Sequence, residues 1–89
     1  MKFFIDYGTG GEPQCCEAND PGDAMVVADE GVTLTHEPIV IRNENGRFVG
    51  RRDWHENLDG IRNQSSPIQI GEGYYGDWRM PMYVQVDMD

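Results

Sequence analysis

The sequence has few basic residues, two cysteines and no long apolar run. Lysine and arginine together number 7 against 16 acidic residues, which gives a formal net charge of −9. A chain of this charge repels the phosphates of nucleic acids, so direct binding to DNA or RNA is not expected. The absence of a long apolar run also argues against a membrane-spanning helix. With 89 residues, the chain is expected to form one domain, residues 1–89.

The N-terminus and the cysteines favour a cytoplasmic protein. The apolar run at Phe3 is much shorter than the h-region of a secretory signal peptide. Cys15 and Cys16 are adjacent, and adjacent side chains of a strand point to opposite faces, so we expect two reduced thiols, one of them packed inward. The alternative is a metal site of these thiols with His36 and His55, but the sequence has no C-x-x-C or H-x-x-x-H spacing. No metal and no cofactor are therefore expected.

The segment from Asp20 to Gly31 has the end signals of a short α-helix. Asp20 can cap the first turn, Pro21 suits a position without a hydrogen-bonded N–H, and Asp23 favours the positive end of the helix dipole. Gly31 would end the helix as a left-handed residue. The helical period predicts which side of the helix each residue takes. The inward side should hold Ala24, Val27 and Ala28, with Met25 beside them. The opposite flank should hold Asp23, Val26 and Glu30, and Asp29 should lie farthest from the core.

Strand signals lie on both sides of this helix. The pair Asn45-Gly46 predicts a tight hairpin, because such turns need residues with positive φ. The expected strands are residues 2–7, 14–18, 37–42, 47–54, 67–70 and 82–86, and residues 55–66 and 71–78 are expected to be connections. The sequence thus predicts an α+β fold, with one short α-helix packed on a mainly antiparallel β-sheet of four to six strands.

No motif predicts catalysis. The glycines of residues 8–11 follow a strand, but the lysine and the helix of a phosphate-binding loop are missing, which favours a flexible hairpin loop. His55 lies near Asp53 and Glu56, so it could act as an acid or base. No serine or cysteine stands in a nucleophile motif, however, and a surface histidine is the favoured interpretation. We expect the protein not to be an enzyme.

Acidic residues are concentrated in the first half of the chain. Residues 1–41 hold eight acids and one base, whereas residues 42–89 hold eight acids and six arginines. The acidic half either forms a solvated surface or docks on a protein partner with a basic surface, in which case binding would depend on salt. The candidate protein-binding residues here are Glu12, Glu17, Asp23, Asp29 and Glu30.

Aromatic residues offer a second candidate surface. Tryptophan, tyrosine and arginine dominate protein interfaces, and Arg51, Arg52 and Arg79 lie close to the aromatic residues in the sequence. The same rings could instead complete a thin core. The candidate protein-binding residues of this set are Trp54, Tyr74, Tyr75 and Trp78.

The order of these elements resembles that of a known class of proteins. A short strand, an acid-capped helix over residues 20–30 and a hairpin over residues 37–54 around Asn45-Gly46 are similar to the β-α-β-β units of several phage-encoded anti-CRISPR proteins. The amino-acid sequence of residues 23–31 and 38–41 also looks like that encoded by short reading frames carried on mobile elements of gut bacteria. The resemblance covers about residues 14–54. It implies a small acidic inhibitor that blocks a nucleic-acid-handling complex by binding it, and it carries over no functional residue.

The sequence therefore predicts a small, acidic, non-enzymatic protein-binding module of phage or mobile-element type, with an anti-CRISPR inhibitor as its most specific form. The alternative is a domain that self-associates, for example as a homodimer, through its aromatic sheet face.

Overall fold

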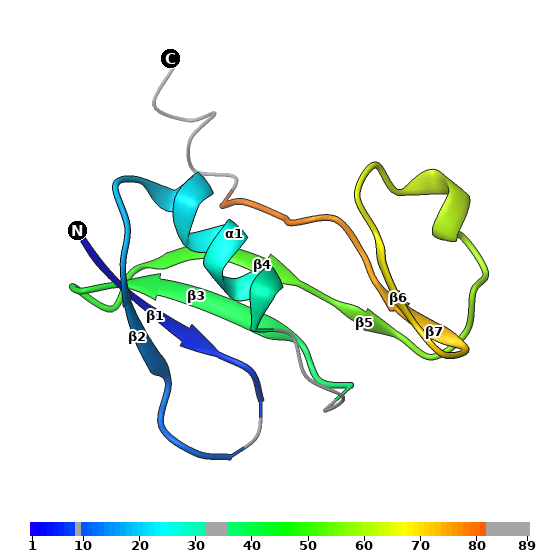
Figure 1. Ribbon diagram of the computed structural model, residues 1–89, viewed down its shortest axis with the longest axis horizontal. Coiled ribbons are helices and arrows are strands. Elements are labelled where there is room, and N and C mark those ends of the chain that lie inside the picture. Colours follow the sequence, from blue (N-terminus) through cyan, green and yellow to red (C-terminus); the bar gives the residue numbers. More distant parts are fainter. Residues whose placement is uncertain (9, 32–35, 82–89) are drawn as a thin grey trace.

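The structure, a computed structural model, describes residues 1–8, 10–31 and 36–81. One α-helix packs on an antiparallel sheet, which confirms the predicted α+β class (Figure 1). The expected strand at 82–86 lies outside the described residues. The elements in chain order are β1 (Lys2–Asp6), β2 (Gln14–Glu17), α1 (Pro21–Glu30), β3 (Ile39–Asn43), β4 (Phe48–Arg52), β5 (Trp54–His55), the 3₁₀ helix η1 (Ile61–Asn63), β6 (Ile68–Ile70) and β7 (Gly73–Tyr75).

The described strands form two sheets. The first has the order β2-β1-β3-β4 and the second the order β5-β7-β6, and all pairings within them are antiparallel. Only Asp53 separates β4 from β5, so the second sheet continues from the end of β4, as Figure 1 shows. The four-stranded sheet agrees with the sequence analysis, whereas the second sheet was not anticipated. In particular, the expectation that residues 71–78 form only a connection is wrong, because they contain β7, the central strand of that sheet.

The hairpin between β3 and β4 forms where Asn45-Gly46 predicted it. Gly46 has a φ of +82°, but Asn45 does not share the positive φ, so glycine alone meets that requirement. The side chain of Asn43 organises the turn, since its Oδ1 accepts hydrogen bonds at 2.9 Å from the backbone N–H groups of Asn45 and Arg47.

The helix begins as predicted and ends differently. Asp20 Oδ1 accepts a hydrogen bond from the Asp23 N–H at 2.9 Å, which caps the first turn. Gly31 has a φ of −94°, so the predicted left-handed ending is wrong. Close packing explains the glycine instead. The Tyr7 hydroxyl donates to the Ala28 carbonyl at 3.1 Å, and a Cβ at position 31 would overlap that hydroxyl.

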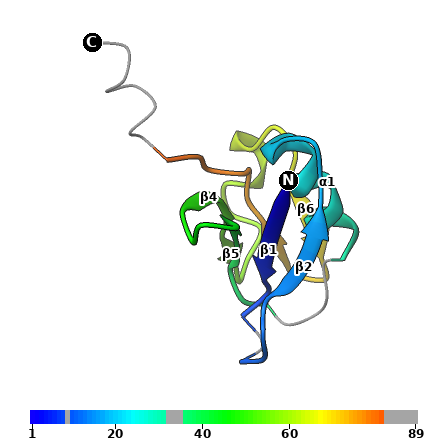
Figure 2. The same cartoon turned by 90° about the vertical axis from the view of Figure 1, so that its left-hand side faces the viewer.

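The core lies between α1 and one face of the first sheet (Figures 1 and 2). Because side chains alternate along a strand, β1 and β3 each send two apolar residues to this face. Small residues of α1 let the helix approach closely, and Tyr75 adds an aromatic ring from the second sheet. The fully packed core consists of Phe3, Ile5, Ala24, Met25, Ala28, Ile39, Ile41 and Tyr75. Within the described segments, no helix is long and apolar enough to cross a membrane.

Candidate protein-binding surfaces

Asp29, one of the acidic candidates, points into the structure. Its Oδ1 accepts a hydrogen bond from Arg52 Nη1 at 2.6 Å and another from the indole N–H of Trp78 at 3.0 Å. The prediction that Asp29 lies farthest from the core is therefore wrong. The physical reason is Arg52, whose side chain is only 1% exposed and whose buried charge requires a partner.

Arg52 connects parts of the chain that are distant in sequence. Its Nε donates to the Gly76 carbonyl at 2.6 Å, its Nη2 donates to the Ser66 carbonyl, and its guanidinium lies 5.6 Å from the ring centroid of Trp78. Each of the three guanidinium nitrogens thus donates a hydrogen bond to an acceptor. Asp29 joins α1 to Arg52 of β4 and to Trp78, which follows β7, so the polar atoms of Asp29 and Trp78 are engaged within the fold.

The exposed acids of α1 form a stripe along the helix. Asp23 and Glu30 are exposed, and Val26 between them is 57% exposed. Their spacing of three and four residues places all three on one side of the helix, as predicted. We call these three residues the helix stripe. Among the described residues, neither Asp23 nor Glu30 takes part in an ion pair.

The remaining acidic candidates lie at the end and the start of β2. The N-terminal ammonium donates a hydrogen bond to Glu17 Oε1 at 3.3 Å and forms an ion pair with this carboxylate. It also lines a shallow hollow of about 220 Å³ together with Asp23, so the structure brings these two carboxylates to one place. Glu12 lies in the connection between β1 and β2 and is exposed. The exposed acidic candidates therefore lie at separate positions, and of these only Glu17 and Asp23 line one hollow together.

The aromatic candidates do not form an exposed face. Tyr74 is 2% exposed and Tyr75 is fully buried. Their hydroxyls donate to the carbonyls of Asp59 at 3.0 Å and Glu37 at 2.8 Å. The two tyrosines point to opposite faces of β7, the central strand of the second sheet: Tyr75 joins the core, whereas Tyr74 stacks on His55. Tyr75 thus completes the core, which was the alternative interpretation of the aromatic set.

Trp54 is the aromatic candidate that lines a hollow. It is half-buried, and its ring meets the edge of Tyr75 at a centroid distance of 5.0 Å. The imidazole of His36 stacks on the indole with a centroid distance of 4.2 Å and an interplanar angle of 1°. Two acidic side chains complete the site, which has a volume of about 610 Å³. We call it the Trp54 hollow, and it is lined by His36, Trp54, Glu56, Ile70, Gly71, Glu72 and Gly73.

Sequence reasoning missed most of this hollow. It considered His36 only as a metal ligand and Glu56 only as a neighbour of His55, and it did not single out Glu72. The sequence separates His36 from Trp54 by a whole hairpin, so only the fold brings the two rings together. The acid at position 72 in a Gly-Glu-Gly turn was the one local signal that a carboxylate would stand exposed there.

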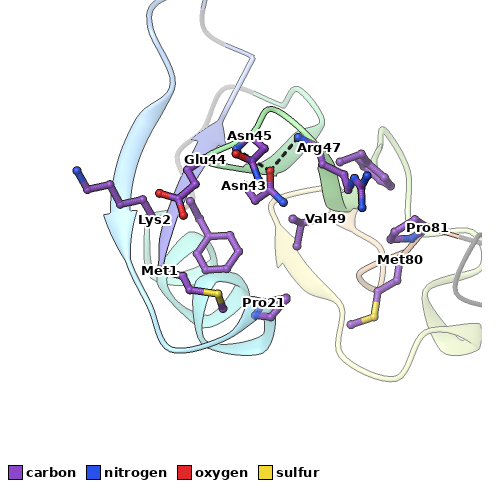
Figure 3. A pocket seen from close by; sticks show the side chains of 12 residues that line it. Met1, Lys2, Pro21, Asn43, Glu44, Asn45, Arg47, Val49, Met80 and Pro81 are labelled. Carbon is purple, nitrogen blue, oxygen red and sulfur yellow. Dashed lines mark hydrogen bonds between the residues drawn. The ribbon is translucent and has the colours of Figure 1, made fainter.

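A third hollow is mostly apolar (Figure 3). It has a volume of about 340 Å³ and lies between the start of β1, the β3–β4 hairpin and residues 80–81. Met1 and Pro21 stand on one side of it, and Met80 and Pro81 on the other. The carboxamide oxygen of Asn43 on its rim is already occupied by the hairpin. Such a hollow can receive an apolar side chain, and Lys2, Glu44 and Arg47 are the charged residues of its lining.

The groups considered for metal binding or catalysis lie apart. Within the described residues, no three His, Cys, Asp or Glu side chains are placed to hold a metal ion. His55 is exposed and stacks on Tyr74 at a centroid distance of 4.7 Å. Cys15 is exposed and Cys16 is half-buried, and both are free thiols as expected. Burial and the neighbouring Cys15 raise the pKa of Cys16, which disfavours its nucleophilic thiolate form.

Comparisons of the chain with protein-family models, curated proteins and solved structures gave no match. Function is therefore inferred from the side chains described above.

Proposed function

We propose that this protein is a non-enzymatic binding module that docks on a protein partner with a basic surface through the helix stripe Asp23, Val26 and Glu30. The observation that carries the proposal is the exposed sequence of acid, apolar side chain and acid along α1, with no ion pair to either acid in the described chain. An apolar centre with charged flanks is a common arrangement at protein interfaces.

The contrast between Asp29 and Glu30 supports this assignment. Negative charge in the last turn of a helix opposes the helix dipole and costs a few tenths of a kcal/mol. Asp29 is offset by the buried guanidinium of Arg52. Glu30 has no such compensation among the described ion pairs, so folding does not account for an acid at that position. A role in binding the partner would account for an acid at position 30.

The charge of the whole chain favours a basic partner. The protein carries a net charge of −9. A positively charged surface therefore attracts it over a distance of about one Debye length, and this attraction accelerates their encounter at low salt. Proteins that handle nucleic acids present such surfaces. The resemblance to anti-CRISPR proteins agrees with this class of partner, and we propose that binding blocks the partner's nucleic-acid groove.

The proposal is tested by identifying the partner and then removing charge at two sites. The tagged protein is isolated from its own host, and co-purifying proteins are identified by mass spectrometry. The affinity of that partner is then measured at low and high salt for wild type, for Asp23→Asn with Glu30→Gln, and for the control Asp59→Asn with Glu44→Gln. The control removes the same two charges from exposed positions outside the helix stripe.

We expect the helix-stripe variant to bind roughly tenfold more weakly at low salt and to lose part of the salt dependence, whereas the control retains most of the affinity. Equal affinities for all three proteins at both salt concentrations would overturn the proposal.

Self-association is a second candidate function, favoured by the sheet face opposite α1. Phe4 and Val40 occupy strand positions that alternate with the buried core residues, and they are only partly buried. Sedimentation equilibrium over a range of concentrations tests this possibility. A dimer that weakens in Phe4→Thr supports it, and a monomer at all concentrations excludes it.

A further inference from the structure

The Trp54 hollow combines an aromatic ring with two carboxylates. Trp54 and Ile70 provide apolar surface, and Glu56 and Glu72 are exposed acids on its rim. Within the described chain, neither acid is part of an ion pair. The charge of the hollow is therefore uncompensated, and its chemistry suits a cation that also has an apolar stem.

His36 shows how a planar group fits against Trp54. Its imidazole is nearly parallel to the indole, at a centroid distance of 4.2 Å. The side chain of His36 is otherwise exposed, and its backbone φ of +59° is the one positive value among the described residues other than glycine. A conformation this uncommon at a hollow is a pointer to function. The imidazole occupies the position that a planar cation would take on this face of the indole.

Arginine fits these features better than lysine does. A guanidinium is planar and weakly hydrated, so it stacks on an aromatic ring, and its N–H groups reach carboxylates on more than one side. The ammonium of lysine is a compact and strongly hydrated charge that does not stack. A Cβ at Gly71 would meet no atom within 4 Å, so this part of the hollow is open and gives room for the arginine stem, whereas Gly73 lets the indole of Trp54 pack directly on the backbone.

We propose that the Trp54 hollow binds an arginine side chain of a basic protein, with the guanidinium replacing His36 on Trp54 and pairing with Glu56 and Glu72. The source of the arginine rests on the proposed function, because the arginine would belong to the same basic partner. The hollow extends that interface beyond α1 and gives it a preference for one side chain rather than for positive charge in general.

The test uses a small probe, so that it does not depend on finding the partner. Isotope-labelled protein is titrated with N-acetyl-arginine amide and, separately, with N-acetyl-citrulline amide, an uncharged ligand of nearly the same shape. We expect the arginine probe to bind with a millimolar dissociation constant, as befits one side chain, and to shift the signals of the Trp54 indole N–H and the Gly71 and Gly73 amides. The citrulline probe should shift these signals at least fivefold less at equal concentration.

Four variants locate the binding. Glu56→Gln with Glu72→Gln should weaken binding of the arginine probe at least fivefold, whereas the matched control Asp59→Asn with Glu44→Gln should leave it unchanged. His36→Gly should tighten binding roughly threefold, because glycine accepts the positive φ and no ring then competes for Trp54. The helix-stripe variant Asp23→Asn with Glu30→Gln should bind the probe as wild type does.

Several results would overturn this inference. They are equal shifts from both probes, shifts confined to the helix stripe, no shift at 50 mM probe, or an unchanged dissociation constant in His36→Gly. Failure of the proposed function remains distinguishable, because a partner indifferent to the helix stripe leaves the response of the Trp54 hollow to the arginine probe intact.

Discussion

Arg52 Nη1 lies 2.6 Å from Asp29 Oδ1, which joins the last turn of α1 to β4 through a charge-assisted hydrogen bond. Arg52 is 1% exposed and Asp29 is 35% exposed, so the pair is shielded on one side only. A buried ion pair adds little net stability over a well-packed apolar pair, but removal of one partner leaves a buried charge uncompensated. The pair should therefore tolerate single substitutions poorly.

We predict that Asp29→Asn destabilises the protein by roughly 2–3 kcal/mol. The loss should be smaller than that of a fully buried pair, because water reaches one side of the carboxylate. Urea unfolding of the variant and of wild type measures the difference.

Glu30→Gln is the matched control, since it removes the neighbouring charge from an exposed position. It should be neutral or stabilise the helix by a few tenths of a kcal/mol. Equal unfolding free energies for the Asp29→Asn and Glu30→Gln variants would show that the pair with Arg52 contributes nothing.

Local signals were sufficient to predict the first half of the fold. The cap at Asp20, the proline at position 21 and the pair Asn45-Gly46 each act through a few neighbouring residues, and each produced the expected helix start or turn. The strand expected at residues 2–7 likewise forms, as β1, and its alternation buries Phe3 and Ile5.

The second sheet and the Arg52 network depend on long-range contacts. β7 holds Gly73-Tyr74-Tyr75, a glycine and two adjacent aromatics without alternation, and it is a strand because β5 and β6 pair with both of its edges. The helical period of the sequence predicted that Asp29 lies opposite the apolar residues of α1, because this period shows only where the apolar side of a helix is. It could not show that a buried arginine lies beside the last turn.

We predict that Gly31→Ala destabilises the protein by roughly 1–3 kcal/mol, because the new methyl group would overlap the hydroxyl of Tyr7. Backbone strain is not the reason, since the φ of −94° suits any residue. Urea unfolding in two backgrounds separates these explanations. In Tyr7→Phe the oxygen is absent, and the nearest ring atom, Cζ, would lie 3.2 Å from the new Cβ.

Tyr7→Phe alone should cost about 1 kcal/mol, because the hydroxyl no longer donates to the Ala28 carbonyl. Gly31→Ala should cost clearly less in this background than in wild type. The same cost in both backgrounds would contradict the close-packing explanation of Gly31.

The carboxylate of Asp77 makes stability depend on pH in the acid range. Its Oδ2 accepts a hydrogen bond from the Ser65 N–H at 2.7 Å, and its Oδ1 accepts one from the Ser66 N–H at 2.6 Å. These two bonds favour the charged form and lower the pKa of Asp77 below its ordinary value of 3.8, and the nearby Arg52 adds to the effect. The folded protein therefore holds this proton less tightly than the unfolded chain does.

The sign of the effect follows from this difference. Stabilisation by Asp77 is fully present above the unfolded pKa, and it is lost as the pH falls through the lower folded pKa. We predict that Asp77→Asn is less stable than wild type at pH 6, because its amide group cannot accept a hydrogen bond from both serine N–H groups. The gap in unfolding free energy should narrow as the pH falls from about 5 to about 2, where Asp77 becomes protonated in the wild type. Urea unfolding of both proteins across this range measures the gap, and a gap that stays constant would show that the carboxylate of Asp77 titrates alike in the folded and unfolded chains.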